Sequence, residues 1–172
     1  HGEPVAGLTW LPLARQRFAA VADGPLLVDG EPAEPLRPAR LEDVMIGVGS
    51  FDIDSRGRVP GTRRLAVITE LSRRVARLRM HGSTGADLAY TAVGALGGAV
   101  VFGHHPWDNA AGVALVRAAG GIATDFAGRP WRIGSGSVVA AAPGVHGEIL
   151  EIVQSATEQS VAQQLGSEGD RT

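Results

Sequence analysis

Residues 99–125 read AVVFGHHPWDNAAGVALVRAAGGIATD, and the order of elements in this segment indicates the fold class. The apolar run at residues 99–102 predicts a buried strand, and residues 122–125 predict another. Between them, residues 108–119 predict a helix whose body carries Arg117 as its only charge. A helix that is apolar on nearly every side lies between layers rather than on the surface. We therefore expect an α/β protein in which this helix is buried.

The flanking sequence extends the same alternation of strands and helices. Short β-favouring runs separated by Pro and Asp-Gly pairs predict an antiparallel meander before residue 32, and a Pro-rich connector follows it. Further on, apolar spacing predicts helices and buried strands of a parallel or mixed sheet. The expected strands are 5–13, 17–22, 25–28, 44–48 and 137–142, and the expected helices are 63–80, 85–96 and 145–165. We expect three regions: an antiparallel-sheet subdomain at 1–38, an α/β subdomain at 39–166 and a flexible tail at 167–172.

Composition excludes several classes of chemistry. The 172 residues include no Cys, so a thiolate nucleophile, a disulfide framework and a thiolate metal site are excluded. All 16 basic residues are Arg, which excludes every mechanism that needs a lysine. Carboxylates, His and carbonyls remain as metal ligands, and they favour hard cations. We find no apolar run that approaches the roughly 18 residues of a membrane span and no signal peptide, so we expect a cytoplasmic protein without a membrane partner.

Asp108 is the most informative polar residue, and two interpretations of it stay open. Asp is a preferred N-cap, so its carboxylate can simply accept the first amides of the helix. It can also act as a metal ligand fixed on a buried helix, with Ala110, Ala111 and Gly112 kept small so that a backbone or a ligand approaches closely. A carboxylate has enough lone pairs to do both.

Other motifs have weaker functional interpretations. The segment Gly82-Ser83-Thr84-Gly85 can hold a phosphate on free amides, or Thr84 and Asp87 can form a capping box. Adjacent His104 and His105 rarely reach one zinc ion. Asp52-Ile53-Asp54 reads as a surface loop of solvated charges rather than a calcium loop. The basic residues of the helix at 63–80 predict a solvated or subunit-interface face, not a nucleic-acid site: Arg73, Arg74, Arg77 and Arg79.

Several motifs together resemble one family. Trp107-Asp108-Asn109-Ala110-Ala111-Gly112, followed by Ala118-Ala119-Gly120-Gly121, resembles the second signature of the inositol monophosphatases, W-D-x-A-A-G with E-A-G-G. The stretch from Gly82 to Tyr90, GSTGADLAY, resembles the family's G-S-A-A-L-D-L-A-Y. Nearly the whole chain is similar to this family, in particular to its actinobacterial and mycobacterial members. The resemblance implies a layered α-β-α-β-α sugar-phosphatase fold, here without its amino-terminal helices and first strands.

The resemblance also implies roles for individual residues. Asp108 would bind a metal ion and contact the hydroxyls of the substrate, while Gly85, Ala86 and Asp87 would line the inositol side of the pocket. The family uses two or three Mg²⁺ ions, but its upstream ligands, in G-E-E and D-P-I-D-G-T, have no counterpart here. We therefore expect no complete catalytic set in this chain, little activity from it alone, and an upstream segment before His1. The family's substrate-binding Glu before the W-D motif is also missing, and His104 or His105 is a candidate replacement.

The resemblance finally implies a function for the complete protein. We expect a homodimeric, Li⁺-sensitive, cytosolic enzyme that hydrolyses myo-inositol 1-phosphate with Mg²⁺ and supplies inositol for phosphatidylinositol synthesis. Two alternatives stay open. One is a relative acting on histidinol phosphate, fructose 1,6-bisphosphate or 3'-phosphoadenylate, and the other is a non-catalytic regulatory or oligomerisation protein of the same fold.

Overall fold

The computed structural model describes residues 2–156. The first part of the chain forms an antiparallel four-stranded sheet whose strands follow one another in sequence order. They are β1 (Ala6–Leu11), β2 (Gln16–Val21), β3 (Leu27–Val28) and β4 (Glu31–Pro32). The expected meander is confirmed, with Ala6 opposite Val21 at one end of the first hairpin and Leu11 opposite Gln16 at the other.

A second sheet of five strands forms the centre of the molecule, in the order β6-β5-β7-β9-β8. Its strands are β5 (Met45–Val48), β6 (Arg77–Arg79), β7 (Gly98–Val101), β8 (Ile122–Thr124) and β9 (Val138–Ala141). Strand β5 is parallel to β6 and β7, whereas β9 is antiparallel to β7 and β8. The sheet is therefore mixed, as expected.

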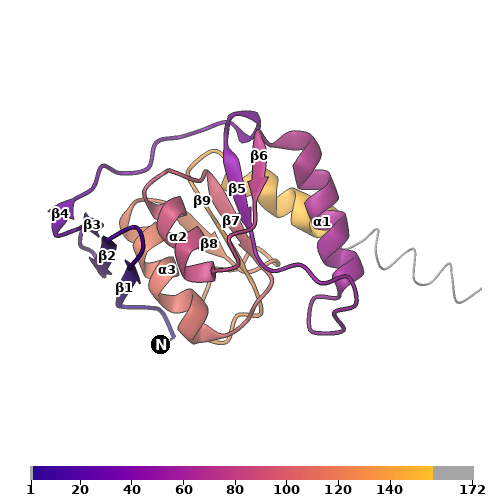
Figure 1. Cartoon of the computed structure of the whole chain (residues 1–172), viewed down its shortest axis with the longest axis horizontal. Helices are drawn as coiled ribbons and strands as arrows, with labels where there is room; N and C mark the ends of the chain where they lie inside the picture. Colours follow the sequence, from indigo (N-terminus) through magenta and orange to yellow (C-terminus); the bar gives the residue numbers. More distant parts are fainter. Residues whose placement is uncertain (1, 157–172) are drawn as a thin grey trace, which may run out of the picture.

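Helices cover both faces of the central sheet and create four layers (Figure 1). The helices are α1 (Gly61–Arg74), α2 (Thr84–Ala92), α3 (Pro106–Ala118) and a last helix over residues 146–156, and a short 3₁₀ turn spans Leu41–Asp43. Helices α2 and α3 lie between the two sheets, while α1 and the last helix cover the opposite face. Alternation along β7 separates two cores, because Ala99 and Val101 join the first cluster and Val100 joins the second.

Small residues on α3 allow its neighbours to approach closely. A Cβ atom added at Gly112 would lie 2.4 Å from Leu88 Cβ on α2. One added at Gly7 of β1 would lie 2.4 Å from the carbonyl oxygen of Ala111. Close packing against α2 thus accounts for Gly112, while the role expected of Ala110 and Ala111 stays a prediction.

The helix expected at 63–80 is wrong in its last third. It ends at Arg74, and Arg77–Arg79 form edge strand β6 beside β5. Leu78 is partly buried between two exposed arginines, so the period there is that of a strand. Arg77 and Arg79 therefore do not share a helical face with Arg73 and Arg74, and Arg74 forms an ion pair with Glu148 at 2.9 Å.

Other boundaries differ slightly or lie outside the described residues. Helix α3 begins at Pro106 rather than residue 108, because Pro is favoured at the first helical position. The last helix was expected to reach residue 165 and the tail to span 167–172, and both ends lie beyond the described part. The division at residue 38 stays a prediction, since one apolar cluster contains Phe18 and Leu26 together with residues of α2 and α3. Among residues 2–156, no helix is long and apolar enough to cross a bilayer.

A histidine is buried in the second core. His146 is 6% exposed, and its Nε2 lies 2.9 Å from the hydroxyl of Thr124. Burial lowers the pKa of His146 below its ordinary value of 6.5, although a hydrogen bond with the backbone of Val139 partly opposes the shift. The unfolded chain consequently binds a proton at a higher pH than the folded chain does.

This buried histidine predicts a loss of stability in mild acid. The free energy of unfolding should be independent of His146 protonation above about pH 6.5. It should fall as the pH drops towards about 5, by at most about 1.4 kcal/mol per pH unit. Urea unfolding across this range measures the effect against His146→Gln, which keeps a polar group beside Thr124 but does not titrate. His104→Gln is the matched control at an exposed histidine. A constant difference between wild type and His146→Gln at every pH would rule out this role.

Candidate functional site

Two helices begin at the same edge of the central sheet. Strands β5, β6 and β7 are parallel, so their carboxyl ends share one edge. Helix α2 begins shortly after β6, and α3 begins shortly after β7. Ligands of open α/β sheets bind at this edge, where loops and helix amino termini converge. The residues predicted for the site, Gly85, Ala86, Asp87 and Asp108, all lie in the first turns of these two helices.

Asp108 lies in the first turn of α3 but is not its N-cap. The N-cap is His105, and the backbone N–H of Asp108 donates to the His105 carbonyl at 3.1 Å. The capping interpretation of Asp108 is therefore wrong, because the helix starts earlier at Pro106. Its carboxylate is exposed and makes no hydrogen bond or ion pair with any residue of the described chain. This acidic group is free to bind a cation in front of α3.

Asn109 holds the loop in front of Asp108, a role that the sequence did not indicate. Its side chain is 0% exposed, and Nδ2 donates to the carbonyl of Gly103 at 3.1 Å. Its Oδ1 is buried without a hydrogen-bond partner among the described residues. The amide thus ties the end of β7 to the first turn of α3, and so fixes where the Asp108 backbone lies. No signal distinguished Asn109, because it occupies the unspecified position of W-D-x-A-A-G.

Three rings lie in a row beside Asp108. His104 and His105 have ring centroids 4.3 Å apart, and His105 stacks on Trp107 at 4.7 Å with planes 14° apart. All three are exposed, with Trp107 at 75%. The stack accounts for their arrangement without a metal ion, and binding of a substrate hydroxyl by either histidine stays a prediction.

The first turn of α2 is capped by Ser83. Its hydroxyl oxygen accepts the backbone N–H of Ala86 at 3.4 Å, and its carbonyl accepts that of Asp87 at 3.0 Å. The predicted capping box of Thr84 and Asp87 is wrong, because the cap lies one residue earlier. Gly85 faces β1, since an added Cβ would meet Thr9 Cγ2 at an ordinary van der Waals distance of 3.9 Å.

Asp87 is buried rather than presented to solvent. It is 1% exposed, and its Oδ1 lies 2.5 Å from Nδ1 of His81. Gly47 of β5 makes room for it, because a Cβ there would lie 3.0 Å from the same oxygen. Burial raises the pKa of Asp87, while the hydrogen bond and the charge of His81 act in the opposite direction. The partner His81 was not foreseen, and a contact between Asp87 and a substrate stays a prediction.

The described residues do not supply a complete metal site. Within 2–156, no group of three or more His, Asp or Glu side chains is placed to hold an ion. Asp108 fits the role of one ligand, because its carboxylate is exposed and unpaired, but an oxygen-coordinated cation such as Mg²⁺ needs about six. Asp52 instead closes a local turn by accepting the backbone N–H of Asp54 at 3.0 Å, which confirms the surface-loop interpretation.

Comparisons with known proteins give a consistent result. A family model described as the inositol monophosphatase family matches residues 1–159. The inositol-1-monophosphatase ImpA of Mycolicibacterium smegmatis is 60% identical over 154 residues, which are 90% of this chain and 56% of that protein. The probable inositol 1-monophosphatase ImpA of Mycobacterium tuberculosis is 59% identical over 157 residues, 91% of this chain and 58% of that protein.

Solved structures agree with the sequence comparison. The inositol monophosphatase of Anabaena (Nostoc) sp. PCC 7120 has a TM-score of 0.80 and 26% identity, over 90% of this chain and 61% of that chain. The expected sugar-phosphatase fold is thereby confirmed. The chain spans little more than half the length of the curated relatives that it matches, at 56% and 58%.

Proposed function

Because the chain belongs to the inositol monophosphatase family, we propose that the complete protein hydrolyses myo-inositol 1-phosphate to myo-inositol and phosphate. The observation that carries the proposal is the 60% identity to the M. smegmatis inositol-1-monophosphatase over 154 residues. Asp108 supports it, since this carboxylate is free at the edge of the sheet where ligands bind. The enzyme is proposed to be a homodimeric, cytosolic, Li⁺-sensitive phosphatase that supplies inositol to phosphatidylinositol synthesis.

The metal in this proposal is Mg²⁺, with two or three ions in a complete site. When bound, Mg²⁺ offsets the negative charge that builds up on a phosphate under attack. Asp108 is the residue of this chain proposed to hold one ion. Asn109 keeps the loop before α3 in place through its hydrogen bond to Gly103. The other ligands are proposed to come from the part of the protein that corresponds to the relatives' remaining length.

The substrate in this proposal lies between the first turns of α2 and α3. The backbone of Gly85, which has no side chain of its own, is proposed to contact the sugar ring. Ala86 is partly buried beside it. Asp87 is proposed to exchange its bond with His81 for one with a hydroxyl of inositol. That exchange leaves no carboxylate unpaired in a buried site, which would be unfavourable.

The test is phosphate release by the complete protein from a panel of monoesters, with and without Mg²⁺. We expect myo-inositol 1-phosphate to be hydrolysed with the highest kcat/KM, and only when Mg²⁺ is present. Histidinol phosphate, fructose 1,6-bisphosphate and 3'-phosphoadenylate complete the panel, because a higher kcat/KM for one of them would replace the proposed substrate. No release from any of them with Mg²⁺ would contradict the enzymatic proposal and favour a non-catalytic protein of this fold.

A further inference from the structure

A hollow of about 590 Å³ lies on the side of the central sheet that faces away from α2 and α3. Its walls are the segment before α1 together with the first turn of α1, the loop between β8 and β9, and the last helix. Strands β7 and β8 are both antiparallel to β9, so they run in the same direction and end at the same edge of the sheet. The loop that follows β8 therefore lies at the edge where β7 ends and α3 begins. The hollow and Asp108 therefore share an edge of the sheet, but they lie on opposite faces.

Two arginines of this hollow have unpaired charges. Arg63 lies in the first turn of α1 with its guanidinium 5.7 Å from the centre of the Phe126 ring. Its Nε is buried and has no hydrogen-bond partner, and burial lowers the pKa of Arg63. Neither Arg63 nor Arg58 forms a hydrogen bond or an ion pair with any described residue. Neighbouring Arg64 differs, since it donates to the carbonyls of Val59 and Ser50, each at 2.9 Å.

The one carboxylate in the hollow does not neutralise them. Oδ1 of Asp125 accepts the backbone N–H groups of Ala127 and Arg129 at 2.9 and 3.0 Å. Its Oδ2 accepts from Nε of Arg129 at 2.9 Å and forms an ion pair with Nη2 at 2.7 Å. Asp125 is thus committed to the loop and to Arg129. Three arginines and one aspartate line the hollow, so two positive charges are left over.

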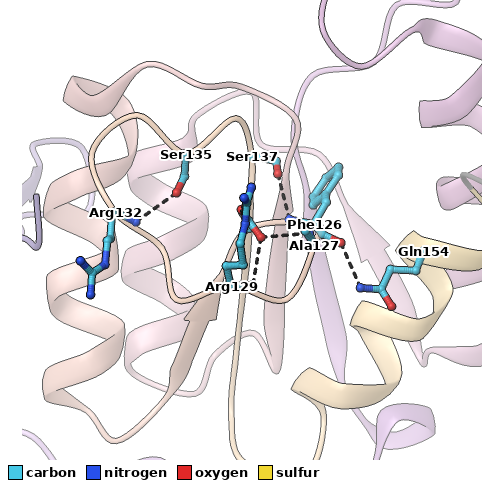
Figure 2. Close-up of polar contacts among 8 residues, drawn as sticks. Phe126, Ala127, Arg129, Arg132, Ser135, Ser137 and Gln154 are labelled. Carbon is cyan, nitrogen blue, oxygen red and sulfur yellow. Dashed lines mark hydrogen bonds and ion pairs between the residues drawn. The ribbon is translucent and has the colours of Figure 1, made fainter.

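Ser137 and Arg58 of the same hollow are placed to donate. The Ser137 oxygen accepts the backbone N–H of Phe126 at 3.0 Å, which leaves its own O–H proton to donate elsewhere (Figure 2). Arg58 lies against Gly136, where an added Cβ would come within 3.0 Å of its Cδ and 3.1 Å of its Nη1. The absence of a side chain at Gly136 therefore allows Arg58 to lie over the β8–β9 loop.

We infer that this hollow binds a phosphate group, held by the guanidinium groups of Arg58 and Arg63 and by the hydroxyl of Ser137. A phosphate dianion matches the two unpaired charges, and the planar fork of arginine suits its oxygens. The terminal guanidinium nitrogens of Arg63 are the donors for the phosphate, because its Nε is fully buried. The hollow is larger than one phosphate, so the group belongs either to free phosphate or to a sugar phosphomonoester. Phosphate binding in this hollow requires neither Asp108 nor the proposed hydrolysis.

The experiment is a calorimetric titration of the protein with inorganic phosphate in EDTA, so that metal-dependent binding is removed. We expect Arg63→Gln and Arg58→Gln each to weaken binding by about tenfold or more, since each removes a charge-assisted hydrogen-bond donor. Arg73→Gln is the matched control: it removes the same charge from the same helix, but Arg73 is paired with Glu70 at 3.2 Å. It should change the Kd less than about twofold. Asp108→Asn should also leave binding in EDTA unchanged.

A second readout and a second variant keep the test decisive if Arg63→Gln is unstable. The guanidinium N–H resonances of Arg63 should shift on addition of phosphate. Arg63→Lys keeps the charge but lacks the planar fork of donors, so its Kd should lie between those of wild type and Arg63→Gln. Glucose 6-phosphate, titrated in the same way, identifies the source: tighter binding than phosphate indicates a sugar phosphomonoester, and equal or weaker binding indicates free phosphate.

Two results would overturn the inference. One is a phosphate affinity that is unchanged in both single variants, Arg58→Gln and Arg63→Lys. The other is phosphate binding that requires Mg²⁺ and is lost in Asp108→Asn, which would place the anion at the metal site instead. Neither result depends on whether the protein hydrolyses inositol phosphate, so this inference and the proposed function fail separately.

Discussion

Replacing Asp108 by Asn in the complete protein is expected to lower kcat for myo-inositol 1-phosphate by at least about a hundredfold, because a charged ligand of a catalytic metal ion contributes several kcal/mol. Asn has nearly the same shape but no negative charge, so it is a far weaker ligand for a hard cation. The measurement is phosphate release at saturating substrate over a series of Mg²⁺ concentrations. A higher Mg²⁺ requirement should accompany the loss of turnover.

The fold should tolerate this change. Asp108 is exposed, its side chain has no partner in the described chain, and the N-cap is His105. The expected loss is the helix-dipole contribution of one exposed charge, about 0.3–1 kcal/mol. Asp54→Asn is the matched control, since it neutralises an exposed carboxylate of the loop before α1 and should leave kcat unchanged. Near-normal phosphate release by Asp108→Asn would remove Asp108 from the site.

Gly112→Ala is expected to destabilise the protein by about 1–3 kcal/mol, because it overpacks the contact between α3 and α2. The added Cβ would lie 2.4 Å from Leu88 Cβ and 2.5 Å from Leu88 Cδ1, so the clash involves the start of a side chain that is 0% exposed. Helix propensity favours Ala over Gly by up to about 1 kcal/mol, which opposes the expected loss. Equilibrium unfolding in urea measures the balance of the two effects.

Gly147→Ala is the control for that prediction. Gly147 lies in the last helix, and an added Cβ there would meet no atom within 4 Å. The same substitution should therefore stabilise the protein slightly, by at most about 1 kcal/mol, through helix propensity alone. If both variants gained stability, the close contact between α2 and α3 would not restrict Gly112.

Much of the architecture is visible in the sequence because it depends on local patterns. The apolar run at 44–48 and the nearly uncharged helix body after Asp108 each predict burial, and β5 and α3 are buried accordingly. Strong turn signals, such as Asp29-Gly30, delimit the strands of the first sheet. These features need no information about distant parts of the chain.

The errors arise where tertiary contacts decide. No Gly or Pro separates Arg74 from Arg77, so the helical period runs on in the sequence, whereas pairing with β5 makes Arg77–Arg79 a strand. The Asp87 carboxylate is oriented by His81 and by the space above Gly47, and neither contact has a local signal. The arginine hollow combines α1 with the β8–β9 loop, which only the fold brings together. Such sites can be identified only from the positions of the charged side chains in the folded structure.

The proposed function rests on Asp108 as a ligand of a divalent cation beside a sugar phosphate. The most direct test is a crystal structure of the complete protein with Mn²⁺ in place of Mg²⁺ and with inositol 1-phosphate, in which anomalous scattering locates the metal. We expect a peak about 2.0–2.3 Å from an Asp108 carboxylate oxygen, in contact with the substrate phosphate. Metal and phosphate bound together elsewhere, with Asp108 in contact only with solvent or its own helix, would contradict it.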